Sequence, residues 1–339
     1  MRFSLAILGL TIVLPAGPAN GWNYRGHELV GMIADKHLTV NAKKAVANIL
    51  GDIDLPTATK WADCVKSVRP PNFEYRPLAQ YAPPCTTFAN SAQEKSRMQD
   101  YVRRNWNTCG LSSGCHNTYH YADVAVQRGM YGAFIGTNGH DIVHAINACL
   151  AVLRGKPAPA PFDFGADDRE RKKEALLLLS HLVGDVHQPL YVGAIYLSAQ
   201  GELVDPDTAG KLDPATDTQG GNLIVLAGKN LQVEWWDDAP NAWDLNMVKL
   251  LMRDVPQFPM QANELDGIVE YWASESVERA AGMFAGLTFQ PKTKVGSIEV
   301  WPATAADLAE YAKGIDFTSQ ISVRLAGSRL AATLNALWP

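Results

Sequence analysis

Apolar residues recur at helical spacing through most of this chain. The clearest runs extend over residues 29–50, 141–153, 171–192, 266–287 and 317–337. Apolar positions that repeat every three to four residues place one face of a helix against a core. Strand-like alternation is scarce, and the best short candidate is Asn222 to Leu226. The pattern therefore predicts an all-α fold with little strand.

Proline and glycine mark the loops between these helices. The main loop stretches are Pro70-Pro71, Pro83-Pro84, residues 157–161 and the long segment 201–221. No internal repeat or low-complexity linker separates two halves. The chain has 339 residues, of which 47% are hydrophobic, which is enough for a sizeable core. We therefore expect residues 22–339 to form a single multi-helix domain with long loops.

The first 21 residues have the pattern of a signal peptide. Arg2 supplies a positive start, residues 3–14 form a short apolar run, and residues 19–21 are small enough for a signal peptidase. The run is shorter than the roughly 20 residues that a membrane span needs. We expect cleavage after Gly21 and export, either secretion or transfer to the periplasm, without a membrane anchor. An uncleaved anchor or a core helix is the alternative. Cleavage would leave Trp22 with a free α-amino group of pKa about 7.7–8.0, which can serve as a nitrogen ligand.

The charge balance limits how a polyanion could bind. Charged residues make up 19% of the chain and the formal net charge is -5. No basic stretch is long enough to act as a polyanion-binding tail. A nucleic-acid substrate would therefore be held by a local site and not by a global positive field. Nothing in the sequence indicates an obligate protein partner.

Five cysteines are present, and export permits disulfides between them. They are Cys64, Cys85, Cys109, Cys115 and Cys149. Cys109 and Cys115 flank a glycine- and serine-rich loop that could close into a small bridge, and Cys64 with Cys85 is a weaker possibility. None has C-x-x-C metal spacing, and an odd number leaves one cysteine over.

The sharpest chemical signal is the pair His181 and Asp185 inside an apolar helical run. Residues four apart share a helix face, so this imidazole and carboxylate can contact one ion. Pro189 follows and predicts an end or kink of the helix. A buried His and Asp can equally form an ordinary hydrogen-bonded pair, so the pair alone does not establish a metal site.

Four further segments change this interpretation. In chain order they are Trp22-Asn-Tyr-Arg-Gly-His27, Trp61-Ala-Asp63, Tyr119-His120-Tyr-Ala-Asp123 and Gly220-Gly-Asn222. Their order, with a tryptophan at the expected cleavage site, resembles the S1/P1 nuclease family, which is related to the zinc phospholipases C. The resemblance runs by motifs from Trp22 to Asp238 and continues through the C-terminal helix at 324–335. It implies a helical domain of the phospholipase C/P1 nuclease type.

The resemblance also implies a zinc centre. One ion would be held by Asp63, His120, His181 and Asp185. A second would be held by the amino nitrogen and carbonyl oxygen of Trp22, by His27 and by Asp185, which thus bridges the two. Imidazole, carboxylate and amine ligands suit zinc. Paired ions about 3.5–4 Å apart can activate a water for in-line attack on phosphorus.

The family's third zinc site departs from the pattern here. The family has histidine directly after Gln-Pro-Leu, where this chain has Tyr191, and a second histidine where this chain has Gln232. The family's aspartate, four residues later, corresponds to Trp236 unless one residue is inserted and Asp237 takes the role. A one-residue slip turns an α-helical side chain by about 100°. We therefore expect two zinc ions, with the third site empty or weak and Asp237 a doubtful ligand.

Other residues take their expected roles from the same resemblance. Asp63 is the base or the residue that orients the attacking water, and Lys66 stabilises charge on the phosphate. Asp123 positions Lys66 or a ligand, and Asn222 donates to a phosphate oxygen. In the family the third zinc supports the leaving 3′ oxygen. Without it, we expect lower activity or dependence on another donor such as Tyr191.

Competing interpretations remain open at this point. His140 and His144 are also four residues apart and could form a metal pair, whereas His187 is expected to be structural or to support a ligand. Bases of a single strand could stack on four aromatic candidates, Tyr81, Tyr196, Trp235 and Trp236. The favoured function is a secreted zinc endonuclease acting on single-stranded DNA or RNA, with 3′-nucleotidase activity. The alternatives are a phosphoesterase on another substrate, such as a phospholipid, and a weakly active or non-enzymatic member.

Overall fold

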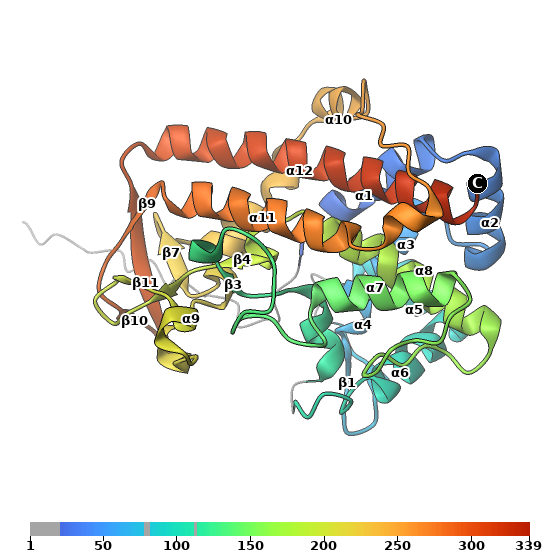
Figure 1. The fold of residues 1–339 in the computed structure, drawn as a ribbon, viewed down its shortest axis with the longest axis horizontal. Helices are drawn as coiled ribbons and strands as arrows, with labels where there is room; N and C mark the ends of the chain where they lie inside the picture. Colours follow the sequence, from blue (N-terminus) through green and yellow to red (C-terminus); the bar gives the residue numbers. More distant parts are fainter. Residues whose placement is uncertain (1–20, 78–81, 112–113) are drawn as a thin grey trace, which may run out of the picture.

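The computed structural model describes residues 21–77, 82–111 and 114–339. The proposed signal peptide, up to residue 20, and Tyr81 lie outside these ranges. The α-helices are α1 (Tyr24–Lys36), α2 (Val40–Leu50), α3 (Leu55–Ala58), α4 (Trp61–Val65), α5 (Thr86–Asn90), α6 (Ala92–Arg104), α7 (Ile142–Leu153), α8 (Asp168–Asp185), α9 (Pro206–Ala209), α10 (Leu245–Leu251), α11 (Ile268–Phe284) and α12 (Leu308–Leu337). The predicted all-α class is confirmed: helices dominate the fold (Figure 1).

Helix α8 is the central element of the core. Its first turns are charged, but every residue from Lys173 to Asp185 is buried. A helix that is apolar on all sides must be surrounded by other elements, and α8 packs against α7, α1, α2, α4 and α12. Asp167 caps its N-terminus by accepting a hydrogen bond from the Glu170 amide. The predicted ligands His181 and Asp185 therefore lie at the buried C-terminal end of α8.

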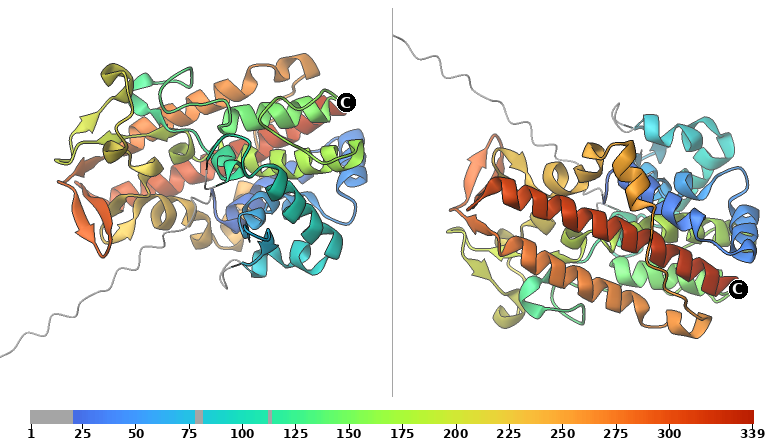
Figure 2. Two further views of the ribbon diagram at one scale, coloured as in Figure 1. Left: turned by 90° about the horizontal axis from the view of Figure 1, so that it is seen from below. Right: turned by 90° about the horizontal axis from the view of Figure 1, so that it is seen from above.

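Helix α1 packs closely along α12. Asn23 caps α1 by accepting from the Gly26 amide, and Leu29, Val30 and Ile33 form part of its buried face. Gly327 of α12 permits the close approach, because a Cβ at that position would lie 2.6 Å from Ile33 Cβ. Figures 1 and 2 show α11 and α12 running along the length of the molecule, with the C-terminus beside α2.

A small mixed sheet lies at one end of the molecule (Figures 1 and 2). Its strands are β7 (Ile224–Leu226), β8 (Lys229–Asn230), β9 (Leu287–Phe289), β10 (Thr293–Val295) and β11 (Ile298–Ala305). Strand β11 pairs in parallel with β7 and antiparallel with β9 and β10. The remaining strands form two-residue pairs: β1 (Val68–Arg69) with β2 (Glu74–Tyr75), β3 (Val124–Ala125) with β4 (Gly193–Ala194), and β5 (Tyr196–Leu197) with β6 (Leu203–Val204).

Three of the predicted helical runs have clearly different limits in the structure, and α12 begins at Leu308, ahead of the predicted run 317–337. The run 29–50 is broken after Lys36, and Thr39 begins α2 by capping the Ala42 amide. Helix α8 ends at Asp185 instead of continuing to residue 192, and a 3₁₀ turn, η5 (Pro189–Tyr191), follows. The early end agrees with the helix-breaking effect of Pro189. In the described part of the chain, no helix combines the length and apolar character needed to cross a bilayer.

Candidate metal centre

His181 and Asp185 meet on one face of α8, as their spacing predicts. His181 Nε2 lies 2.9 Å from Asp185 Oδ2. The other ring nitrogen of His181, Nδ1, is 2.7 Å from the Thr59 carbonyl oxygen, to which it can donate a hydrogen bond. That bond would fix the tautomer in which Nε2 carries a lone pair toward the centre, as is usual for metal-binding histidines.

Three other segments bring their predicted ligands to the same point. His120 Nδ1 lies 2.8 Å from Asp185 Oδ2, and His27 Nε2 lies 3.2 Å from Asp185 Oδ1. His181 Nε2 is 3.1 Å from His120 Nδ1 and 3.7 Å from Asp63 Oδ1. All five side chains are buried. One carboxylate thus faces three imidazole nitrogens, with a second carboxylate close by.

These side chains form two overlapping groups whose ligand atoms lie within 4.8 Å of one another. The first is Asp63, His120 and His181, and the second is His27, His181 and Asp185. Both ring nitrogens of His27 and Asp185 Oδ1 are buried without a hydrogen bond. Buried polar atoms without partners are costly, and nitrogen and carboxylate ligands at this spacing suit zinc. The residues present therefore fit a pair of metal ions.

The electrostatics of the centre favour metal-binding protonation states at His27, His120 and Asp185, whereas the charges of Asp185 and Asp63 raise the pKa of His181 despite its burial. Burial, with a further effect of Lys66, lowers the pKa of His120 to about 4. Burial and the nearby His181 lower the pKa of His27. Burial alone would raise the pKa of Asp185, but His181 and hydrogen bonds from the imidazoles hold it well below its usual value. A neutral imidazole and an ionised carboxylate are the forms that bind metal.

Trp22 lies immediately beside this centre. Its side chain is fully buried, and its indole nitrogen donates to the Gly184 carbonyl at 3.1 Å. The next amide, that of Asn23, donates to the Asp237 carbonyl at 3.0 Å. A Cβ added to Gly21 would fall 1.5 Å from Asp185 Oδ1 and 3.1 Å from His27 Nε2. The residue before Trp22 therefore lies against two of the predicted ligands.

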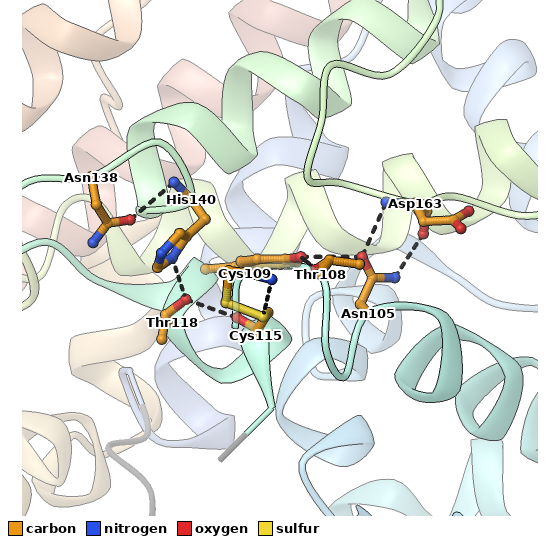
Figure 3. The surroundings of a disulfide bond; sticks show 9 residues. Asn105, Thr108, Cys109, Cys115, Thr118, Asn138, His140 and Asp163 are labelled. Atoms are coloured by element: carbon orange, nitrogen blue, oxygen red, sulfur yellow. Dashed lines mark hydrogen bonds between the residues drawn. A yellow bond between two sulfur atoms is a disulfide. The ribbon is translucent and has the colours of Figure 1, made fainter. Parts of the chain in front are cut away.

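Both disulfides are adjacent to ligand-bearing segments. Cys64, next to Asp63, is bonded to Cys85, while Cys109 is bonded to Cys115 at the start of the 3₁₀ helix η3 (Cys115–His120), which ends in His120. Both suggested pairings are confirmed, and Cys149 is free and buried. Figure 3 shows the second bridge with Thr118, whose hydroxyl donates to the Cys115 carbonyl and lies 2.8 Å from His140 Nδ1.

The rival histidines have other partners. His140 precedes α7 and contacts Thr118, whereas His144 Nδ1 lies 2.9 Å from Asp141 Oδ1. They do not form a pair on one helix face, because the helix begins only at Ile142. His187 lies 2.7 Å through Nδ1 from the Val183 carbonyl and accepts from Arg329 at 2.9 Å. These contacts agree with a structural role for His187.

The structure places Lys66 directly at the centre. Its ammonium donates to Asp63 Oδ1 at 2.7 Å, and both side chains are buried. Asp123 has a different neighbour from the one expected: burial and the charge of Asp217 raise its pKa to about 8. Asn222 is half-buried and donates its amide to the Gln219 carbonyl at 3.0 Å.

The residues at the predicted third site form a separate polar group beside the centre. Leu231–Asp237 is a π-helix, η8, in which the Asp238 amide donates to the Val233 carbonyl five residues earlier. In a π-helix, residues five apart take the relation that residues four apart have in an α-helix. The inserted residue is thereby absorbed, so Asp237 is buried inside and accepts from Gln188 Nε2 at 2.8 Å. The rotation of about 100° considered for a one-residue slip applies to an α-helix, and this segment is a π-helix.

This polar group does not fit a third zinc site. Tyr191, Gln232 and Asp237 offer a phenol, an amide and one carboxylate, but no imidazole nitrogen. Zinc prefers nitrogen, sulfur and carboxylate ligands. Within the described residues, neither group of close ligand atoms includes Asp237.

Two of the aromatic stacking candidates are wrong. Tyr196 and Trp236 are 1% and 0% exposed, so neither offers a face to a base. The Tyr196 hydroxyl instead donates to the Asp123 carbonyl. Trp235 is half-buried and donates its indole N–H to the Leu226 carbonyl. Sequence reasoning also missed Thr59, whose backbone carbonyl orients His181, and Gln188, whose side-chain amide donates to Asp237. A backbone carbonyl contact leaves no sequence signal.

A helical domain with buried imidazoles and carboxylates gathered around Asp185 is typical of a metal-dependent hydrolase, and the reaction class here is the hydrolysis of phosphodiester bonds. More particularly, the chain belongs to the S1/P1 nuclease family, whose profile matches residues 22–339. It is 24% identical to Endonuclease 2 of Arabidopsis thaliana over 356 aligned positions, covering 98% of this chain and 96% of the relative. It is 25% identical to Endonuclease 1 of the same plant, over 74% of this chain and 61% of the relative.

Proposed function

We propose that this protein is an exported, zinc-dependent endonuclease that hydrolyses single-stranded DNA and RNA, with 3′-nucleotidase activity. The observation that carries the proposal is the convergence of three imidazole nitrogens on Asp185 beside Asp63. Membership of the S1/P1 nuclease family, and similarity to two proteins named as endonucleases, support the reaction class.

Two zinc ions are proposed. Asp63, His120, His181 and Asp185 would hold one, and the Trp22 amino and carbonyl groups, His27 and Asp185 the other. When bound, the zinc pair supplies Lewis acidity and lowers the pKa of water toward neutrality. The position of Gly21 against Asp185 supports the need to remove the preceding residues, since an amide nitrogen cannot replace the free amine. The two disulfides support export, because they persist in oxidising compartments.

The protein's own residues would then position the phosphodiester and move the protons. The Asp63 carboxylate orients the attacking water and accepts its proton. Lys66, 2.7 Å from that carboxylate, lies close enough to stabilise the charge that develops on the phosphate. Asn222 turns its amide from the Gln219 carbonyl to a phosphate oxygen. The expected role of Asp123, positioning Lys66 or a ligand, stays a prediction.

The test begins with metal analysis of mature protein that starts at Trp22. We expect two zinc ions per chain and chelator-sensitive cleavage of single-stranded DNA, RNA and a 3′-nucleotide. Asp185→Asn should lose zinc and activity, because the shared ligand is weakened. Asp168→Asn, the same change at an exposed site on α8, should lose neither. Hydrolysis of a lecithin-type lipid without nucleic-acid cleavage would replace the proposed substrate, and mature protein without tightly bound zinc would overturn the proposal.

A further inference from the structure

Three buried side chains near the metal centre have oxygen atoms whose hydrogen bonding is incomplete. Tyr191 is 0%, Gln232 2% and Asp237 2% exposed. The Tyr191 hydroxyl faces the Gln232 side chain, which is its one hydrogen-bonding neighbour among the described residues, and that contact falls outside ordinary hydrogen-bond geometry. Asp237 Oδ2 has no partner in the described structure, and leaving such a group buried costs about 1–3 kcal/mol. An unpaired carboxylate oxygen beside a poorly paired phenol and amide indicates a site that a ligand completes.

The location of this group, which we call the Tyr191 pocket, links it to the reaction. Burial raises the pKa of the Tyr191 phenol well above its usual value, and the charges of Asp237, Asp185 and Asp63 add to this. The Ala122 amide, two residues after His120, donates to the Tyr191 carbonyl at 2.8 Å. Tyr191 is therefore held beside the segment that carries His120, and its phenol keeps its proton.

The Tyr191 pocket is closed on one side by the backbone at Gly220. A Cβ there would lie 2.7 Å from the Leu190 carbonyl and 3.4 Å from Gln232 Oε1, and the residue has a φ of +63°. Only glycine satisfies both constraints without strain. The Gly220 backbone thus lies against Gln232, close to Asn222, the proposed phosphate-binding residue.

The chemistry of these side chains favours hydrogen bonding over metal binding. One oxygen of Asp237 already accepts a hydrogen bond from Gln188. The other two side chains, Tyr191 and Gln232, are neutral. A single carboxylate oxygen with a phenol and an amide is a poor ligand set for zinc. A phenol O–H held in a buried site, by contrast, is a strong donor to an oxygen on which negative charge develops.

We propose that Tyr191 donates a hydrogen bond and then its proton to the 3′ oxygen that leaves phosphorus, replacing the third metal ion of the family with a side-chain acid. This rests on the proposed function. In the step, the P–O3′ bond breaks with its electron pair on O3′, and a new P–O bond forms from water. Water gives one proton to Asp63, and O3′ takes one from the phenol. Exchange with solvent returns both residues to their starting states after the product leaves.

The experiment compares two leaving groups in the zinc-loaded, mature protein. An oligonucleotide needs an acid to expel its 3′ alkoxide, whereas thymidine 5′-(p-nitrophenyl phosphate) releases p-nitrophenolate unaided. Tyr191→Phe should lose about 10²-fold in kcat on the oligonucleotide, within the range of general acid catalysis. It should keep kcat on the activated ester within a few-fold, with two zinc ions still bound.

The matched control is Tyr101→Phe. Tyr101 is also buried, and its hydroxyl has no hydrogen-bond partner in the described structure, so this change removes the same group from a different part of the core. It should change neither kcat. Tyr191→His combined with Gln232→His should raise the zinc content from two to three and cleave the oligonucleotide at least as fast as wild type.

Three outcomes would overturn the assignment: an equal loss on both substrates in Tyr191→Phe, no loss on either, or three zinc ions in the wild-type protein. A wild-type protein that cleaves neither nucleotide substrate would instead refute the proposed function. The two failures are therefore distinguishable.

Discussion

Gly184 lies between His181 and Asp185 on α8, and Gly184→Ala tests how closely the metal centre is packed. A Cβ at this position would lie 2.8 Å from His27 Nδ1 and 3.1 Å from its Cε1. Ordinary contacts begin near 3.4 Å, so the imidazole must move by 3.4 − 2.8, about 0.6 Å. Metal–ligand distances tolerate only about 0.2 Å. The required shift is about three times that tolerance.

The imidazole of His27 has little room for this movement. It is fully buried and stacked on His181 with ring centroids 3.8 Å apart. Overpacking of this kind costs about 1–3 kcal/mol, whereas replacing glycine by alanine inside a helix gains about 1 kcal/mol. The net loss of stability should be between about 0 and 2 kcal/mol. The protein should therefore fold, but bind the ion shared by Trp22 and His27 at least 10-fold more weakly.

Chelator competition and metal analysis measure the zinc affinity, and a thermal melt in excess chelator measures the fold alone. Gly282→Ala is the matched control, because a Cβ at Gly282 of α11 meets nothing within 4 Å. It should stabilise the protein by up to about 1 kcal/mol and leave zinc binding unchanged. If Gly184→Ala retained two zinc ions with wild-type affinity, His27 would not be a ligand in the arrangement described.

Three further predictions concern the N-terminus, pH and the π-helix. An alanine placed before Trp22 should remove one zinc ion, because its Cβ would fall 1.5 Å from Asp185 Oδ1. At least 90% of the activity should be lost, roughly the effect of a 10-fold weaker metal site. A variant with full metal content would contradict this. Asp123 has a folded pKa of about 8, raised by burial and Asp217, so its stabilising contribution is present below about pH 4 and lost as pH rises through 8. Melts of Asp123→Asn against wild type should therefore favour the variant increasingly from about pH 5 to pH 8 and level off above that, by on the order of 4 kcal/mol in total, and a constant difference would refute the shift. Deleting the exposed Glu234 should convert the π-turn to an α-turn with a melting temperature within about 5 °C of wild type, and failure to fold would show that the turn is not a tolerated insertion.

The sequence predicted the part of the site that depends on local geometry. His181 and Asp185 are four residues apart in an apolar run, and the structure brings them to 2.9 Å. The approach of His27, His120 and Asp63 follows from long-range packing, which spacing does not encode; only the family resemblance indicated it. The resemblance supplied the ligand set but not the tautomer of His181, which depends on a carbonyl of another segment.

What sequence reasoning missed was irregular backbone. Strand β11 contains Pro302, and a proline within an apolar run argues against a strand, yet β11 pairs with three neighbours. The possible insertion before Asp237 was left open, since helical periodicity assumes hydrogen bonds between residues four apart. A π-turn keeps the flanking residues on their original faces, and nothing in a run such as Val233-Glu-Trp-Trp-Asp237 distinguishes the two geometries.

The same π-turn contacts both the Tyr191 pocket and the N-terminal segment that begins at Trp22. The Asp237 side chain reaches into the Tyr191 pocket, while the Asp237 carbonyl accepts from the amide of Asn23 at 3.0 Å. Asn23 is the residue after Trp22, whose amino group is the proposed ligand. The backbone that aims the carboxylate therefore also fixes the position of Asn23, next to the proposed mature N-terminus. A change in the turn would move the proposed Trp22 amine ligand and the Tyr191 pocket together. An inserted residue is therefore compatible with the proposed metal pair only if the backbone absorbs it locally, as the π-helix does.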